Sequence, residues 1–316
     1  MFDENYVLEP LRELADCACC PRNCHVRRDR GELGYCRTGA GFGIGAICVH
    51  SGEEPVISGP HGICNVFFTR CNMQCLYCQN YQISRNRGDI LERRLELRDI
   101  VAHIERVIER GVRTVGFVSP SHCIPQMKAI IRALDGRANN PVLVMNTNAY
   151  DRAETLKSLE GVMDVYLPDL KYMDAELAKR YSDAYDYVDV ATTALKEMYR
   201  QKGSEVRMGG DGYIASGLIV RHLVVPGHAE DSKRCLRFIA EELSPEVHVS
   251  LMAQYAPTPS VAGHRELGRR LYPEEYDEVL EELDRLGFSN GWTQELESAE
   301  FYQPDFARSH PFEEGD

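Results

Sequence analysis

The sequence has no long hydrophobic run, and nothing in its 316 residues resembles a secretion signal. A helix that spans a bilayer needs about 20 consecutive, mostly apolar residues, and no segment comes close to that length. The N-terminal stretch MFDENYVLEP has neither the basic start nor the apolar segment of a signal peptide. We therefore expect a cytoplasmic protein without a membrane span.

Positive charge is also scarce. Lys and Arg number 36 against 49 Asp and Glu, so the net charge is −13. Binding of a phosphate backbone needs a basic surface, and this deficit disfavours nucleic acid as the main partner. The remaining composition, 43% hydrophobic and 27% charged, is that of an ordinary globular protein and excludes a disordered, collagen-like or coiled-coil chain.

Cysteine, in contrast, is abundant. The chain has twelve, and without an export signal they are not expected to form a disulfide framework, because the cytosol keeps thiols reduced. Ten of the twelve lie between Cys17 and Cys78. Cysteines used only as small buried hydrophobes would have no reason to gather in this way. The crowding predicts a metal or reactive thiols near the front of the chain.

From about residue 62 onward, short apolar runs alternate with amphipathic helical segments. The runs are rich in β-branched residues and nearly continuous, as buried parallel strands are. They predict strands at residues 63–68, 114–118, 142–145, 163–167, 218–225 and 247–251. Apolar residues at helical spacing predict helices at 97–108, 127–134 and 273–286. Asp151, three residues before Glu154, resembles a capping box at the start of a further helix.

Six strand-then-helix units predict an α/β fold with a parallel sheet and right-handed crossovers, either curled into a partial (β/α)6 barrel or left open. In both arrangements, function belongs at the carboxyl ends of the strands. We divide the chain into a Cys-rich metal-binding unit at residues 1–61, the barrel at 62–292 and a C-terminal tail at 293–316. The tail is polar, and we expect it to be loose.

Three cysteines follow the first predicted strand, spaced three and then two residues apart. Thiolates of Cys71, Cys75 and Cys78 can hold three irons of a [4Fe–4S] cluster and leave the fourth iron open to a substrate or cofactor. The alternative is a zinc site or a cluster used only for electron transfer, and either needs a fourth ligand close by. His61 or Cys64 could supply it.

The CxxxCxxC spacing, with Tyr77 before the last cysteine and a strand before the first, resembles the signature of the radical S-adenosylmethionine (SAM) superfamily. The resemblance implies that SAM chelates the open iron and that an electron from a reductant such as flavodoxin or ferredoxin breaks the bond from sulfur to C5′. The 5′-deoxyadenosyl radical so formed abstracts hydrogen from its target. The cofactors carry this chemistry, and the protein supplies geometry and excludes water.

Further blocks resemble pyruvate formate-lyase activating enzymes, in particular the activating enzyme-like subgroup often labelled PflX. They are CPRNC, EEPVISG, FFTRCNMQCLYCQNYQIS, YLPDLKY, RHLVVPGH and LMAQYAP, and they run from about residue 17 to 292. This likeness implies hydrogen abstraction from a protein or peptide. Two alternatives remain: the same radical could modify a small molecule, or the protein could be a noncatalytic iron–sulfur or zinc-binding protein.

The resemblance also implies which residues surround SAM. They are Tyr77, Ser119, Asn146, Thr147, Asp169, Lys171 and Arg221. Thr147 and Asp169, together with Met252, would approach a monovalent cation beside the SAM carboxylate, because oxygen ligands suit such an ion. From the residues alone, Asp169 could instead cap a helix. Arg221 could pair with a carboxylate of SAM or substrate, or pin a loop.

One stretch departs from the superfamily. Many members have Gly-Gly-Glu after the second strand, where the glutamate receives the SAM amine, and residues 118–122 here read VSPSH. Ser119 and His122 offer hydrogen-bonding groups in its place, but the carboxylate is missing. Cys123 lies in the same loop and could face the pocket.

The N-terminal unit has its own cysteine pattern. Cys17, Cys20, Cys24 and Cys36 can form a tetrahedral zinc site or a closed auxiliary [4Fe–4S] cluster, and either would stabilise a segment too small to fold alone. Next along the chain, His50, Glu53 and Glu54 could suggest a hydrolytic zinc site. Their spacing lacks the helical pair of ligands that such sites use, so we interpret them as a loop feature.

Overall fold

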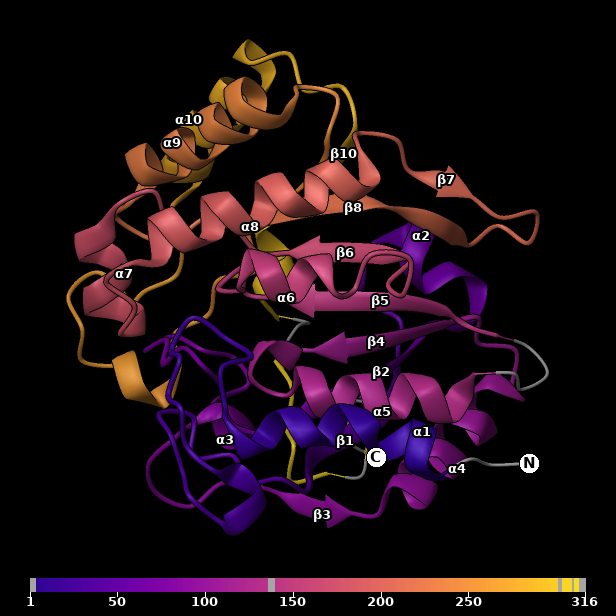
Figure 1. Ribbon diagram of the computed structural model, residues 1–316. Coiled ribbons are helices and arrows are strands. Elements are labelled where there is room, and N and C mark those ends of the chain that lie inside the picture. Colours follow the sequence, from indigo (N-terminus) through magenta and orange to yellow (C-terminus); the bar gives the residue numbers. More distant parts are fainter. Residues whose placement is uncertain (1–3, 136–139, 301–302, 309, 313–316) are drawn as a thin grey trace.

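The computed structural model describes residues 4–135, 140–300, 303–308 and 310–312. Its centre is a ten-stranded, mostly parallel sheet in the order β10-β9-β8-β6-β5-β4-β2-β1-β3, with β7 paired to β8 (Figure 1). The strands are β1 Phe42–His50, β2 Ile63–Phe68, β3 Arg93–Leu95, β4 Thr114–Val118, β5 Val142–Thr147, β6 Val165–Pro168, β7 Arg207–Met208, β8 Ile214–Leu223, β9 His248–Met252 and β10 Gly291–Thr293.

The six expected strands are all present. They are β2, β4, β5, β6, β8 and β9, and they pair in parallel in that order. The order ends at β10 on one side and at β3 on the other, so the sheet curls without closing. The prediction of an α/β fold with an incomplete barrel is therefore confirmed. Burial on both faces explains why the strands are so continuously apolar.

Helices pack against the sheet and connect its parallel strands (Figure 1). The α-helices are α1 Glu4–Leu8, α2 Pro55–Ser58, α3 Tyr81–Ser84, α4 Leu97–Ile108, α5 Ile124–Leu134, α6 Ala153–Lys157, α7 Ala175–Ser182, α8 Tyr187–Lys202, α9 Ala229–Phe238 and α10 Pro273–Arg285. Short 3-10 helices span Glu9–Ala15, Arg28–Arg30, Gly59–His61, Pro120–His122, Pro259–Val261 and Leu296–Glu300, and a π-helix spans Ile239–Leu243. None of the helices in the described ranges is long and apolar enough to cross a membrane.

The first strand, β1, was not expected from the sequence. It pairs antiparallel with β2, from Ile44 opposite Phe68 to His50 opposite Ile63. Part of the expected N-terminal unit thus belongs to the same sheet as the barrel, and the boundary at residue 61 separates two hydrogen-bonded strands. Glycines at the start of β1 hide its apolar pattern, and one of them has little room for a side chain. A side chain on Gly43 would place its Cβ 2.6 Å from the Thr69 hydroxyl oxygen.

The capping box expected at Asp151 was wrong. The N-cap of α6 is Arg152, and no side chain caps that helix. Asp151 is buried and accepts a hydrogen bond from the Thr147 hydroxyl at 2.5 Å. A tertiary contact with Thr147, the last residue of β5, thus takes the place of the expected cap.

The C-terminal tail also differs from the expectation of a loose segment. In its described part, Phe306 is 3% exposed and its ring lies 5.2 Å from that of Phe67 in β2. The ring of Phe312 lies 5.7 Å from the same side chain. Phe306 and Phe312 thus anchor the described part of the tail on the sheet.

The Cys-rich N-terminal segment packs against the ends of the strands. Arg28 is 2% exposed and donates at 2.8 Å to the carbonyl oxygen of His122, which follows β4. Arg22 donates at 2.8 Å to the carbonyl oxygen of Asn72, inside the cysteine loop. The segment therefore supports the loop that carries the three cysteines.

Candidate active site

A cavity of about 660 Å³ lies at the carboxyl ends of the parallel strands. It brings together every site residue predicted outside the N-terminal unit: Cys71, Cys75, Tyr77, Cys78, Ser119, Asn146, Thr147, Asp169, Lys171 and Arg221. Met252 lines it as well. These residues come from six segments far apart in the sequence, and the parallel sheet gathers them because its strands all end at one edge.

The cysteine loop begins where β2 ends and is held by backbone contacts with α7. Arg70 takes a left-handed conformation, with φ of 65°, and turns the chain out of the strand. The amide of Gln74 donates to the carbonyl oxygen of Ser182 at 3.0 Å, and the amide of Leu76 to that of Tyr181 at 2.8 Å. Both acceptors belong to α7, so this helix fixes the loop.

Each of the three cysteine sulfurs has a hydrogen-bond donor beside it. The Ser182 hydroxyl lies 3.0 Å from the sulfur of Cys75 and the Ser84 hydroxyl 3.3 Å from that of Cys78. The side-chain amide of Asn148 lies 3.4 Å from the sulfur of Cys71. Donors of this kind stabilise thiolates that bind a metal or cluster.

The three cysteine thiols fit the ligand set of a [4Fe–4S] cluster. Burial raises the pKa of Cys71 to about 12 and that of Cys75 to about 11, so both thiols stay protonated until a metal displaces the proton. The fourth ligands considered from the sequence, His61 and Cys64, are not among the residues that line the cavity, and Cys64 is fully buried in β2. Three thiols facing one cavity match a cluster with one open iron.

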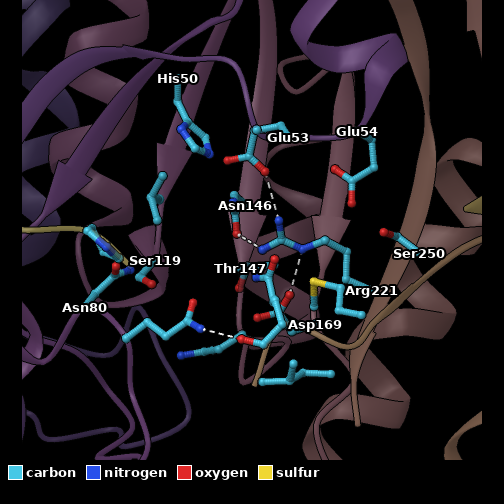
Figure 2. Close-up of a pocket in the computed structure, with 18 of the residues that line it drawn as sticks. His50, Glu53, Glu54, Asn80, Ser119, Asn146, Thr147, Asp169, Arg221 and Ser250 are labelled. Atoms are coloured by element: carbon cyan, nitrogen blue, oxygen red, sulfur yellow. Dashed lines mark hydrogen bonds and ion pairs between the residues drawn. The ribbon is translucent and has the colours of Figure 1, made fainter. Parts of the chain in front are cut away.

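Arg221 in β8 is the centre of a charged network (Figure 2). Its guanidinium donates to Asp169 at 2.8 Å, Glu53 at 2.9 Å and Asn146 at 2.9 Å. Lys171 donates to the other oxygen of Asp169 at 2.8 Å. Arg221 therefore contacts the loop that carries Glu53, and its pairing with a carboxylate of SAM or substrate stays a prediction.

Asp169 remains ionised in this network. Burial alone would raise its pKa, but the nearby charges of Arg221 and Lys171 lower it to about 2. Both of its oxygens accept from these two side chains, so it does not cap a helix; the N-cap of α7 is Asp174. The monovalent cation beside Asp169 and Thr147 stays a prediction.

The loop after β4 contributes fewer side chains to the cavity than the sequence suggested. Ser119 lines the cavity in a left-handed conformation, with φ of 52°. His122 is buried, and its ring lies 2.9 Å from the carbonyl oxygen of Thr69. Neither His122 nor Cys123 is among the residues that line the cavity. Both side chains are buried instead.

Sequence reasoning missed the segment 50–59. His50, Glu53 and Glu54 all line the cavity, although we had interpreted them as a loop feature. The acidic pair before Pro55 was visible in the sequence. Its position inside the barrel follows from the contact with Arg221, 168 residues away, which no local pattern reveals.

The N-terminal cysteines do not line this cavity. Arg28 lies beside them, with its guanidinium 3.7 Å from the sulfur of Cys17. Across the described ranges, no three Cys, His, Asp or Glu side chains converge closely enough to suggest a site for one metal ion. A metal at Cys17, Cys20, Cys24 and Cys36 stays a prediction.

Comparison with known proteins gives a family and a fold. The sequence model of the Radical SAM superfamily matches residues 65–214. The uncharacterized protein MJ0674 of Methanocaldococcus jannaschii is 30% identical over 274 residues, which cover 84% of this chain and 73% of that protein.

Solved structures agree with the match. SuiB from Streptococcus suis, bound to S-adenosylmethionine, aligns with a TM-score of 0.52 at 13% identity over 78% of this chain and 53% of SuiB. HydG, a maturase of the [FeFe]-hydrogenase, aligns with a TM-score of 0.52 at 13% identity over 93% of this chain and 56% of HydG. The chain spans about half the length of either protein. At such identity the likeness shows a shared fold.

Proposed function

Because the chain belongs to the radical SAM superfamily, we propose that it is a hydrogen-abstracting enzyme whose target is a protein or peptide. Membership implies a [4Fe–4S] cluster, SAM and a reductant, and flavodoxin or ferredoxin would suit the last role. The observation that carries the proposal is the opening of three cysteine thiols into the same cavity as the network of Asp169, Lys171 and Arg221.

In this proposal Cys71, Cys75 and Cys78 hold the cluster. When bound, the cluster and SAM supply the 5′-deoxyadenosyl radical. The chain itself orients the loop through α7, donates hydrogen bonds to the three sulfurs and keeps the Asp169 carboxylate ionised next to Lys171. The cavity walls limit the access of water, which protects a reactive radical from side reactions.

Two observations support a peptide target. The blocks that resemble pyruvate formate-lyase activating enzymes favour an activase-like reaction. SuiB, which shares the fold, has also been solved bound to its precursor peptide SuiA, with a TM-score of 0.51. We further propose that Cys17, Cys20, Cys24 and Cys36 bind a structural metal, either zinc or an auxiliary cluster.

Replacement of one cysteine tests the proposal. With dithionite and SAM under anaerobic conditions, the wild type is expected to release 5′-deoxyadenosine, and Cys75→Ser to release none above background, because a ligand of the cluster is lost. Metal analysis should show that the metal of the N-terminal cysteines is retained. The matched control is Cys235→Ser, at a buried thiol of α9 that does not line the cavity. Turnover by Cys75→Ser at the wild-type rate would refute the assignment.

A further inference from the structure

Part of the cavity wall comes from outside residues 65–214, the part that matches the superfamily model. Besides Arg221 and Met252, which were assigned to SAM and the cation, this wall includes segment 50–59, Trp292 in β10 and Phe312 in the tail. Superfamily members share the cluster chemistry and differ in their targets. Wall residues outside the matched region are therefore the natural place for features that select the substrate of this chain.

Glu54 is the distinctive group of this wall. Its side chain is 7% exposed and lines the cavity, and its Oε2 atom has no hydrogen-bond partner among the described residues. Burial raises the pKa of Glu54, with a smaller opposing effect from Arg221. A buried carboxyl group without a full set of partners is costly, and a bound cation or donor would remove that cost.

The positive charges nearby are already paired. Arg221 donates hydrogen bonds to Asp169, Glu53 and Asn146, and Lys171 donates one to Asp169. Glu53, the neighbour of Glu54, has a full set of partners, since it also accepts from the side-chain amide of Asn65 at 2.9 Å. Glu54 is thus the carboxyl group in this network without a close cationic partner.

The groups that share the cavity with Glu54 suit an organic cation. Figure 2 shows Ser250 on the same side of the cavity as Glu54, and both residues line it. Trp292, Phe67 and Phe312 line the same cavity. Aromatic faces attract ammonium and guanidinium groups, and a carboxylate adds an ion pair. A carboxyl group with aromatic walls is a common arrangement for binding such groups.

We propose that this wall binds an ammonium or guanidinium group of the substrate, with Glu54 as its ion-pair partner and Trp292 as an aromatic contact. The inference rests on the proposed function, because it names the substrate class for the same cavity. It adds that the hydrogen donor carries a basic group, such as a lysine or arginine side chain in a peptide.

Butylammonium is the probe, and 1-pentanol, a neutral alcohol one heavy atom longer, is the comparison. Ligand-observed NMR titrations of the full-length, cluster-loaded protein in saturating SAM give the two dissociation constants. Trp292 is the only tryptophan, so its fluorescence shows whether the probe enters this cavity. We expect butylammonium to bind at least tenfold more tightly than 1-pentanol, and Glu54→Gln to remove that preference. Glu281→Gln, on the exposed face of α10, is the matched control and should bind like the wild type.

A second variant covers the case in which Glu54→Gln does not fold. Trp292→Leu should weaken butylammonium binding more than 1-pentanol binding, because only the cation gains from the ring face. Equal binding of the two probes, wild-type affinity in Glu54→Gln, or displacement of butylammonium by SAM would each overturn the inference.

Release of 5′-deoxyadenosine is measured in parallel. Its absence would contradict the proposed function alone, whereas unselective binding by a protein that cleaves SAM would contradict this inference alone.

Discussion

At the scale of single residues, the sulfur of Cys75 stands at the end of a chain of hydroxyl groups. The Tyr77 and Tyr172 hydroxyls lie 2.5 Å apart, and the Tyr172 hydroxyl lies 2.8 Å from that of Ser182. Ser182 in turn donates to Cys75 at 3.0 Å. Hydrogen bonds to cysteine sulfurs are one of the means by which a protein sets the reduction potential of an iron–sulfur cluster.

Ser182→Ala is therefore expected to shift the reduction potential of the bound cluster to a more negative value. Removal of the donor leaves more negative charge on the sulfur, and this disfavours the reduced cluster. A redox titration followed by electron paramagnetic resonance measures the shift. Ser158→Ala, on an exposed turn after α6, is the control. An unchanged potential in Ser182→Ala would contradict the expected role of the hydrogen bond.

His222 gives a pH dependence that can be tested. Burial lowers its pKa to about 4, and its Nδ1 atom lies 2.6 Å from the carbonyl oxygen of Leu170. The pKa in the unfolded chain is about 6.5, so the unfolded state binds the proton first as the pH falls. The stability that the neutral ring contributes is complete above about pH 6.5 and is lost between there and about pH 4, which amounts to about 3 kcal/mol.

The comparison is between the wild type and His222→Asn, whose amide can still donate to Leu170. Denaturant titrations give the free energy of unfolding of both proteins. The difference by which the wild type is more stable than His222→Asn should be about 3 kcal/mol smaller near pH 4 than near pH 7. A comparison of variants is needed because burial raises the pKa of Asp151 and of Asp231 to about 6, which acts in the opposite direction. The exposed His25→Asn is the control, and an equal change in both variants would rule out this origin.

At the scale of elements, α7 connects the body of the protein with the cysteine loop. Its N-cap, Asp174, accepts hydrogen bonds from the amides of Glu176 at 2.9 Å and Leu177 at 3.2 Å. The other end of the helix carries Tyr181 and Ser182, whose carbonyl oxygens hold the cysteine loop. The position of the loop therefore depends on an intact helix.

Asp174→Ala is expected to reduce the free energy of unfolding by about 1 kcal/mol, because two amides of the first turn lose their acceptor. Denaturant titration measures the loss. Asp174→Asn should retain most of the stability, since an asparagine side chain also caps helices. If the two substitutions cost the same, hydrogen bonding at the cap is not what stabilises α7.

The elements also show how far the sequence predicts this fold. Strands β2 and β4 and helix α4 have the expected bounds, because their apolar spacing reflects burial in the core. Strand β1 escaped prediction because glycines interrupt its pattern. Short strands such as β3 and β10 have three residues each, too few for any periodicity to appear.

The candidate site divides in the same way. The sequence predicts the roles of Cys71, Cys75 and Cys78 because their spacing is local. It predicts those of Asp169 and Arg221 because they lie at strand ends or in matched blocks. The sequence did not predict that segment 50–59 lines the cavity. It depends on where the chain passes over the barrel, and that position is fixed by tertiary contacts such as the one between Glu53 and Arg221.

At the scale of the whole molecule, the tail joins two distant parts of the sheet. It leaves β10 at one edge and places Phe306 against Phe67 in β2, near the other edge. The side chain of Gln82 holds this turn in place, since it accepts from the amide of Phe306 at 2.7 Å and donates to Asp305 at 3.0 Å.

Phe306→Ala is expected to destabilise the protein by about 3 to 5 kcal/mol, as loss of a buried phenyl ring does. Thermal and denaturant unfolding measure the cost. Phe306→Leu, which keeps most of the apolar volume, should cost clearly less. A cost of only a few tenths of a kcal/mol for Phe306→Ala would mean that the tail contributes little to the core.

The unclosed sheet has a mechanical consequence. A closed barrel has a circumference fixed by its backbone hydrogen bonds, and widening it breaks several of them at once. Here no backbone ladder joins the edge strands β10 and β3, and the tail after β10 packs Phe306 and Phe312 against Phe67 of β2 through side-chain contacts. We therefore expect the width of the cavity mouth to be less tightly constrained than in a closed barrel, while the parallel ladder keeps the strands that carry the reactive groups aligned.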